Sequence, residues 1–407
     1  MGLRSYPSRV VDYTGQTNWW VDPAGTFGGS DGNTGGSAAS PLRTLAEWRR
    51  RACKGGVTWE PAGFGILTIM SDCAESAYFN IVGVAASRDG TIRGRDTVVA
   101  TGTVTAAAQL SSAGGGTYAT LTSTGTTWAP HVGRRVRIQG SGDDWLPGLY
   151  AYVRADLGSG VALVTPWTDG GGQAAAPSPG ATWEVYTVPK VSGQWGITCN
   201  SADHYVAVDF DVGGDPFVSG IYVTAGYGSQ VHSLQVLSDG YTFEAQAGSY
   251  VQAYGVFAAG GHIRSQSGHL VLCGGGSTGA GQRIYAIDGY VVISGAMMLE
   301  NNAFLNVQGG ASLLVNAEVG IRNSNTRAIA VTDGKIQLSQ KVFATGSTAT
   351  NGIEVEAGQT LLVAPGMLPS ISTPTNFASI GGVAKSAAAL VSDYVAPNGA
   401  SLVYKIF

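Results

Sequence analysis

The sequence predicts an all-β fold in which short parallel strands stack into a solenoid, and three observations support this prediction. Glycine supplies 61 of the 407 residues and charged residues only 12%, so tight bends are frequent and charged faces are few. Short β-type segments that end at glycine recur between residues 190 and 364 at spacings of 20 to 24 residues. Within each segment large apolar side chains alternate with others, as they do in a strand with one buried face.

The repeats align into columns that assign the two faces of each strand. The aligned glycines are Gly226, Gly248, Gly268, Gly289, Gly310, Gly334 and Gly358. Five positions before them the residue is always large and apolar: Ile221, Phe243, Ile263, Ile284, Leu305, Ile329 and Ile353. We expect this column to face the interior, with each turn ~4.8 Å from the next and glycine relieving the bend at each corner.

The rest of the chain divides by composition into four further regions. Residues 1–60 combine a strand, a Gly-rich loop and a helix over 41–56, for which Thr44 and Glu47 have capping-box spacing and Gly55 and Gly56 mark the end. We expect this helix to cap the first turns, at 61–97. Residues 98–188 change to short strands broken by glycine and proline, which predicts an inserted small antiparallel β-module. The main solenoid occupies 189–364, and 365–407 is predicted to be a segment for assembly.

Charge and apolar runs exclude several classes of protein. The net charge of −4 gives no support to a protein that tracks nucleic-acid phosphates. No apolar run has the length of a signal peptide or a membrane-spanning helix. The four cysteines lack the spacing of a zinc or redox site, which favours synthesis in a reducing host cytoplasm and no cofactor.

Two stretches resemble known families. The segment NWWVDPAGTFGGSDGNTGGSAASPLRTLAEW resembles the opening of right-handed parallel β-helix proteins of the pectate-lyase-like superfamily, through Val21, Asp22, Pro23, Gly25, Asp31, Gly32, Pro41, Leu42, Thr44 and Leu45. The inserted region is similar to small β-modules of phage tail and spike proteins, through Trp128, Val132, Gly133, Arg134, Val136, Ile138, Gly148 and Tyr150. Together these resemblances imply a right-handed parallel β-helix in a virion-associated tail spike, tail fibre or surface fibre. They also imply a homotrimer that meets other virion proteins and host cell-surface polysaccharide.

One outward column is the leading candidate for a binding surface. The alternation places Tyr222, Glu244, Arg264 and Tyr285 on the outer face of four successive turns, within ~15 Å of one another. We expect an exposed ridge of aromatic and charged groups that contacts a glycan or another subunit. The alternatives are a local Glu–Arg pair beside structural tyrosines, or packing between the subunits of a trimer.

Two acidic clusters are weaker candidates. Asp143, Asp144 and Trp145 put carboxylates beside an aromatic ring in a loop of the insertion, a combination typical of sugar contact, although a plain Gly/Asp/Pro turn reads the same way. Asp209 and Asp211 would share the outer face of one strand and, with Asp215, could hold Ca²⁺ or act as a glycosidase pair, the alternative being a solvated strand and turn.

No catalytic signature can be placed on the chain. The segment GGGSTGAGQR lacks the Gly-Lys-Ser/Thr ending of a phosphate-binding loop and is predicted to be a loop between turns. The favoured function is therefore a virion surface protein that contacts host glycans. A polysaccharide-cleaving glycosidase or lyase, and a purely structural virion protein, remain the two alternatives, because fold does not decide among them.

Overall fold

A computed structural model gives the fold of the chain. It describes residues 18–54, 58–59, 66–75, 77–81, 90–113, 116–140, 148–169, 172–191, 195–199, 206–209, 211–212, 221–224, 226–232, 235–236, 242–245, 249–258, 262–278, 283–322, 327–345, 351–365, 367, 369–371, 376–380, 382–385, 394–395 and 400–404. Side chains are described for a subset of these residues.

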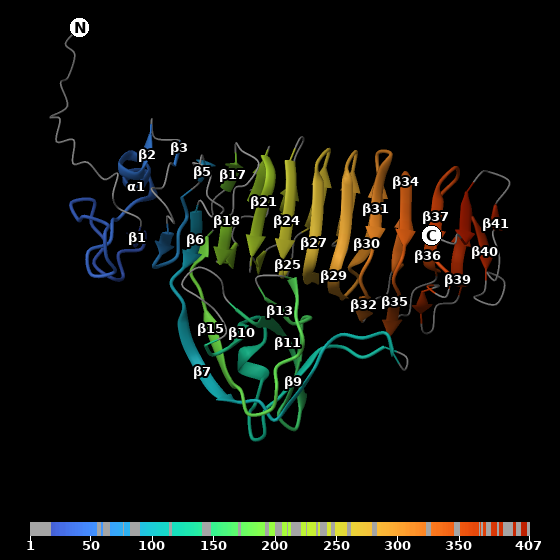
Figure 1. Ribbon diagram of the computed structural model, residues 1–407, viewed down its shortest axis with the longest axis horizontal. Coiled ribbons are helices and arrows are strands. Elements are labelled where there is room, and N and C mark those ends of the chain that lie inside the picture. The colour runs from blue at the N-terminus through green and yellow to red at the C-terminus, as the bar shows by residue number, and fades with distance from the viewer. Residues whose placement is uncertain are drawn as a thin grey trace, which may run out of the picture.

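The described residues form an elongated parallel β-solenoid with a smaller antiparallel β-structure beside it (Figure 1). A four-stranded sheet of the solenoid contains β1 (Asn18–Val21), β4 (Ile66–Ile69), β6 (Gly90–Gly94) and β18 (Val206–Asp209). A 13-stranded sheet contains β2 (Cys53–Lys54), β3 (Thr58–Trp59), β5 (Ala77–Ile81), β17 (Trp195–Cys199), β20 (Ile221–Thr224), β23 (Thr242–Ala245), β26 (His262–Gln266), β28 (Arg283–Ile287), β30 (Phe304–Gln308), β33 (Ile329–Val331), β36 (Asn351–Val355), β39 (Asn376–Ile380) and β40 (Val383–Lys385).

The third sheet of the solenoid has 16 strands and bends along its length. It contains β16 (Lys190–Val191), β19 (Asp211–Val212), β21 (Gly226–His232), β22 (Gln235–Val236), β24 (Ser249–Tyr254), β25 (Val256–Ala258), β27 (His269–Thr278), β29 (Tyr290–Glu300), β31 (Ala311–Val315), β32 (Val319–Arg322), β34 (Gly334–Leu338), β35 (Val342–Thr345), β37 (Thr360–Val363), β38 (Ser370–Ile371), β41 (Tyr394–Val395) and β42 (Ser401–Tyr404). The long strands β27 and β29 pair with β24 and β31 through their first halves and with β25 and β32 through their second halves, so they join two faces of the solenoid.

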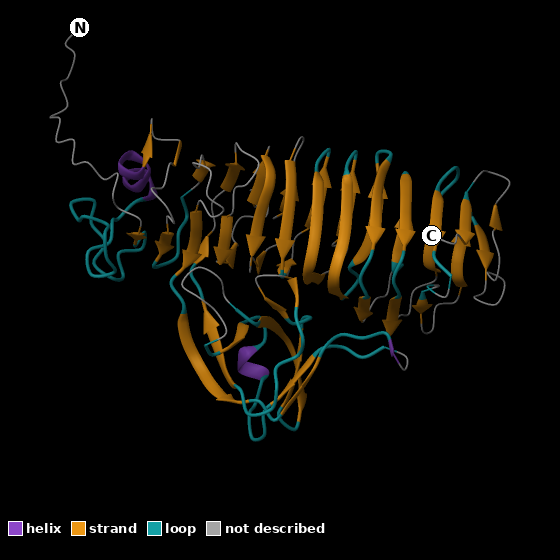
Figure 2. Cartoon of the chain, viewed as in Figure 1, coloured by secondary structure: helices purple, strands orange, loops and turns teal. Residues whose placement is uncertain are grey.

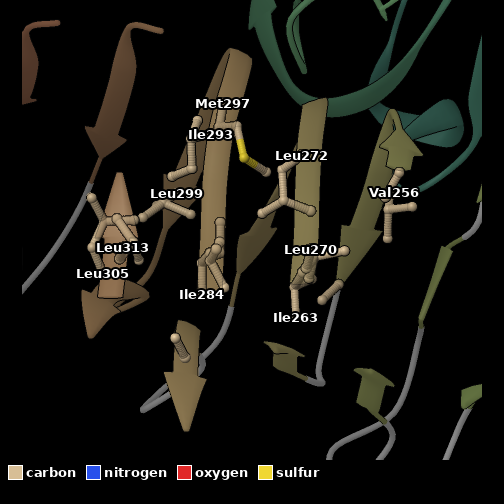
Figure 3. Packing of buried hydrophobic residues seen from close by; sticks show 14 of the residues in the cluster. Val256, Ile263, Leu270, Leu272, Ile284, Ile293, Met297, Leu299, Leu305 and Leu313 are labelled. Atoms are coloured by element: carbon tan, nitrogen blue, oxygen red, sulfur yellow. The ribbon is translucent and has the colours of Figure 1, made fainter. Parts of the chain in front are cut away.

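The predicted columns are confirmed by the strand register. Phe243, Ile263, Ile284, Leu305, Ile329 and Ile353 are direct neighbours in successive strands. The last five of these side chains are fully buried in one continuous core. Ile263, Ile284 and Leu305 meet there the inward side chains of the 16-stranded sheet, among them Leu272 and Ile293 (Figure 3).

The aligned glycines differ in backbone conformation: Gly310, Gly334 and Gly358 have positive φ angles, whereas in the turns after β26 and β28 the positive φ lies one position earlier. After β26 and β28 the residues with φ near +50° are Ser267 and Asp288, and only after β30 is a glycine, Gly309, in this place. Gly289 is required for a different reason: a Cβ there would lie 2.6 Å from Ser265 Oγ and 2.8 Å from the carbonyl oxygen of Gly268. Close approach between turns, rather than backbone conformation, explains this glycine.

Two aspartate carboxylates, those of Asp22 and Asp31, accept hydrogen bonds that hold the N-terminal cap together. Asp22 is fully buried and accepts hydrogen bonds from the amides of Phe27 and Gly29 and from Ser71 Oγ. Asp31 accepts hydrogen bonds from the amides of Arg43 and Thr44. These bonds fold the Gly-rich loop onto β1 and deliver the chain to the start of the helix.

Helix α1 spans Leu45–Ala52, and its capping differs in part from the predicted reciprocal box. Thr44 Oγ1 accepts from the Glu47 amide, as expected. The Glu47 carboxylate does not return to the Thr44 amide, which Asp31 already occupies, and instead binds Arg50 and Arg51. The helix ends at Ala52, earlier than the expected end at Gly55 and Gly56, because the backbone becomes extended at Cys53, where β2 begins. Within the described residues, no helix has the length and hydrophobicity needed to cross a membrane.

The Glu47 pair predicts an acid-sensitive contribution to stability. Hydrogen bonds from Arg50, opposed by burial and aided by Arg51, lower the pKa of Glu47 to about 2. A folded pKa below the unfolded value means that the contribution is complete above about pH 4.5 and is lost as the pH falls through about 2. We expect Glu47→Gln to be less stable than the unmodified chain at pH 7, with the difference in urea midpoint shrinking toward zero near pH 2. An equal difference at both pH values would show that the ion pairs do not stabilise the cap.

The antiparallel structure is a sheet curled into a barrel (Figure 2). Its elements are β7 (Thr97–Thr103), β8 (Ala106–Ala108), β9 (Thr120–Thr122), a 3₁₀ helix (Ala129–His131), β10 (Arg135–Ile138), β11 (Tyr150–Gly158), β12 (Val161–Val164), β13 (Thr168–Asp169), β14 (Gly172–Gln173) and β15 (Thr182–Thr187). Strand β7 pairs with β15, whereas β8, two residues further on, pairs with β9. One bent segment, residues 97–108, therefore forms both edge strands of the sheet. Trp128 is fully buried in the core of the barrel, where its ring centroid lies 4.8 Å from that of Trp183. Its Nε1 donates a hydrogen bond to the carbonyl oxygen of Gly160.

The barrel packs tightly against outward side chains of the solenoid. Met298 and Phe343 belong to the same buried cluster as the barrel residues Leu110 and Trp128. The segment between β8 and β9 reaches along the solenoid to β32 and β35 (Figure 1), where Tyr118 Oη lies 2.6 Å from the carbonyl oxygen of Ile321 in β32 and 2.7 Å from Thr345 Oγ1 in β35. Gly274, expected in a loop, instead belongs to strand β27. A Cβ there would lie 2.3 Å from Thr168 of the barrel, so close docking explains this glycine.

Candidate functional site

The outward column of the 13-stranded sheet is assembled in the predicted register. Tyr222 pairs with Glu244, Glu244 with Arg264, and Arg264 with Tyr285. The same column continues through Asn306, Ala330 and Glu354, as the alignment of the repeats predicts, although these three lie outside the predicted ridge. We call these seven residues the ladder.

The predicted exposure of the ridge is wrong for two of its members. Glu244 is fully buried and Tyr285 is 6% exposed, although both point away from the solenoid core. The guanidinium of Arg264 lies against both side chains, and the ring of His262 meets the Tyr285 ring edge-on at 5.5 Å. Side chains of neighbouring turns therefore cover the ladder from outside. Tyr222 has its backbone in β20, and its side chain lies outside what the structure describes.

Arg264 is the central group of the ladder. Its Nε and Nη2 lie 2.5 Å from Glu244 Oε2, and its Nη1 donates to Tyr285 Oη at 3.0 Å. Partners on the turns before and after it thus fix the plane of the guanidinium, while 23% of the side chain remains exposed. Burial would lower the pKa of Arg264, but the hydrogen bond to Tyr285 and the charge of Glu244 outweigh it and raise this pKa. Arg264 is therefore a permanent, oriented cation.

Glu244 has a second, unused acceptor. Its Oε1 is buried and has no hydrogen-bond partner among the described residues. A buried carboxylate oxygen without a partner is costly, and here the oriented guanidinium on Oε2 offsets that cost. Glu244 thus acts on the surface through Arg264 rather than by direct contact.

The far end of the ladder carries a second ion pair. Arg327 binds Glu354, whose side chain is 30% exposed, and its guanidinium lies over the ring of Phe304 at 5.4 Å. Between the two pairs, Thr332 Oγ1 donates to Asn306 Oδ1 at 3.2 Å. The face thus presents two partly exposed arginines fixed by carboxylates, while the Asn306 amide between them is buried.

The two carboxylates of the ladder lie far apart. Glu244 and Glu354 are five turns apart in the register, which is ~24 Å along the solenoid. Glycosidases of either stereochemistry need two carboxyl groups within about 10 Å. The described part of the ladder therefore lacks the acid pair of a glycosidase.

The acidic clusters predicted from sequence are only partly described. Asp143, Asp144, Trp145 and Asp215 lie outside the described residues. Asp209 ends β18 in the four-stranded sheet and Asp211 begins β19 in the 16-stranded sheet, so the expectation that they share one strand is wrong. The chain changes sheets between them, which the alternating pattern could not reveal. Among the residues with described side chains, no three His, Cys, Asp or Glu groups gather as metal ligands.

Comparison with known proteins finds similarity only at the level of solved structures. No protein-family model matches the chain, and no curated protein matches it. A protein described as a glycoside hydrolase aligns with 89% of this chain and 96% of its own, at 10% identity and a TM-score of 0.31.

Two phage tailspikes are also among the structural neighbours. The tailspike of Acinetobacter baumannii bacteriophage AP22, in complex with A. baumannii capsular saccharide, aligns with 84% of this chain and 72% of its own, at 9% identity and a TM-score of 0.27. The tailspike of Pseudomonas phage LKA1 aligns with 87% of this chain and 79% of its own, at 13% identity and a TM-score of 0.22. The chain is thus similar, remotely, to tailspikes and to a glycoside hydrolase.

Proposed function

We propose that the protein is a virion surface component, of the tail-spike or fibre kind, that binds host polysaccharide along the ladder. The observation that supports this most is the oriented guanidinium of Arg264, held by Glu244 and Tyr285 on adjacent turns and still partly exposed. The resemblance of the inserted region to small β-modules of phage tail and spike proteins supports the virion setting.

The chemistry of the ladder suits a polyhydroxylated chain. Sugar hydroxyls need donors and acceptors in fixed positions, and a group whose rotamer is already fixed loses little entropy on binding. Arg264 and Arg327 supply such donors, and Thr332 adds a hydroxyl between them. Because successive turns lie ~4.8 Å apart, Arg264 and Glu354 stand four turns apart in the register, which gives the face the extended form that a polysaccharide chain would follow.

The test is polysaccharide binding by variants that keep the fold. Arg264→Lys retains the charge beside Glu244 but cannot donate to Glu244 and Tyr285 as a fork. We expect its dissociation constant on an array of immobilised bacterial polysaccharides to rise about tenfold, the effect of losing one hydrogen bond to a charged group, about 1.5 kcal/mol. The matched control, Arg50→Lys on helix α1, should bind as the unmodified chain does.

Oligomeric state separates this function from a purely structural one. If the ladder packs against other subunits instead, Arg264→Lys will shift the mass measured by light scattering and leave polysaccharide binding unchanged. That result, or an array on which no polysaccharide binds the unmodified chain, contradicts the proposal. Release of shortened oligosaccharides during the assay would favour the enzyme instead.

A further inference from the structure

A hollow of about 300 Å³ lies where three parts of the chain meet. The Gly-rich loop contributes Phe27, the turn after β4 contributes Asp72, and Arg95 precedes the barrel. The two ends of the barrel form another wall through Thr97 and Thr187, which pair with each other in the sheet. A volume of this size lies at the lower end of the range for small-molecule sites.

Two opposite charges line this hollow without pairing. The Arg95 guanidinium stacks over the Phe27 ring at 4.1 Å from its centroid, and Phe27 is 39% exposed. Asp72 is exposed, and its Oδ1 accepts a hydrogen bond from the Lys190 amide. Within the described residues neither charged group forms an ion pair, with the other or with any third group. The hollow therefore offers a strong donor and a strong acceptor at separate places.

The walls are fixed before any ligand arrives. Ser71 Oγ donates to Asp22 and accepts from the Ala24 amide, and Asp22 in turn holds the amide of Phe27. The pKa of Asp22 is lowered because these hydrogen bonds outweigh its burial, so the carboxylate that anchors the loop stays charged. Phe27, with the Arg95 guanidinium over its ring, thus stands on a loop that is tied to the solenoid.

We propose that this hollow binds a single neutral pyranose residue, a second glycan site apart from the ladder. A pyranose presents hydroxyl donors to the Asp72 carboxylate and oxygen acceptors to the Arg95 guanidinium, while its C–H groups pack against Phe27. Asp72 and Arg95 together add no net charge to the hollow, so it has no overall electrostatic preference for a charged ligand, and a neutral sugar can use both groups. The choice of ligand class rests on the proposed function, whereas the site itself rests on the geometry of the hollow.

The experiment measures saturation transfer by NMR from the full chain to the methyl α-glycosides of glucose, galactose and mannose, with glucuronate as a charged probe. At least one neutral glycoside should receive saturation. Asp72→Asn and Arg95→Gln should each weaken its binding at least fivefold, and Arg264→Lys should leave it unchanged. Both altered residues are exposed, so we expect unchanged melting temperatures.

Three outcomes of this experiment would overturn the proposed site in the hollow. It fails if no neutral glycoside binds, if binding survives Asp72→Asn and Arg95→Gln, or if glucuronate alone binds. Polysaccharide binding that depends on Arg264 without any binding of single sugars would leave the ladder standing and remove the hollow. Binding of single sugars without any effect of Arg264→Lys on polysaccharide would do the reverse.

Discussion

Replacing Ile284 with aspartate should unfold the central turns of the solenoid. Ile284 is fully buried between Ile263 and Leu305 of the neighbouring strands. Its surroundings are aliphatic, with Leu272 and Ile293 on the facing sheet (Figure 3), and supply no partner for a carboxylate. Losing the buried side chain alone costs about 2–5 kcal/mol, and an unpaired charge adds to this. The total approaches the stability of many whole domains.

The measurement is urea unfolding followed by circular dichroism. Gln266→Asp is the matched control, because Gln266 is exposed on the adjacent strand β26 and points outward. We expect the control to unfold within about 0.5 kcal/mol of the unmodified chain and Ile284→Asp to be largely unfolded or insoluble. Equal midpoints for the two variants would show that the column is not the core of the solenoid.

Glu300→Ala should loosen the contact between the barrel and the solenoid. The Glu300 side chain is 4% exposed, and its two oxygens bind Arg154 of the barrel at 2.9 Å and Arg322 of the solenoid at 3.1 Å. Removing the shared carboxylate leaves the guanidinium groups of Arg154 and Arg322 without this partner in a mostly buried interface. Breaking a buried ion pair in this way costs about 3–5 kcal/mol, and the partial exposure of Arg322 places the expected value near about 3 kcal/mol.

Hydrogen exchange with mass spectrometry locates this effect. We expect faster exchange in the barrel strand β11 and in solenoid strand β32, with little change in strands β36 and β37. Glu356→Ala is the control, since Glu356 is exposed and far along the chain from this contact. If Glu300→Ala leaves exchange in β11 and β32 unchanged, the ion pairs do not hold the barrel in place.

The solenoid could be predicted from sequence because its signal is periodic. Isoleucine or another large apolar residue recurs in one column from Phe243 to Ile353, and each repeat supports the alignment of the next. The sequence did not reveal that residues 206–212 form two strands, because the alternation of apolar and acidic residues continues from β18 into β19. The capping box was only half right, because Asp31, distant in sequence, competes for the Thr44 amide.

The candidate site was predictable in its register but not in its burial. Alternation places Glu244 and Tyr285 on the outer face, yet it cannot show that Arg264 lies across both and closes them off. The hollow beside Phe27 could not be predicted from the sequence, because its walls come from segments that are distant in the chain. Asp72 and Arg95 follow the paired strands β4 and β6, and the hollow forms only where the Gly-rich loop and the two ends of the barrel fold beside them.

The most direct test of glycan binding by the ladder is a crystal structure of the full chain soaked with a fragment of a polysaccharide that binds it. We predict sugar density over the outer face of the 13-stranded sheet, with a hydroxyl or ring oxygen within hydrogen-bonding distance of the Arg264 guanidinium and the Glu244–Arg264–Tyr285 contacts retained. Density on other faces only, with the surface around Arg264 covered by a neighbouring subunit, would contradict this function.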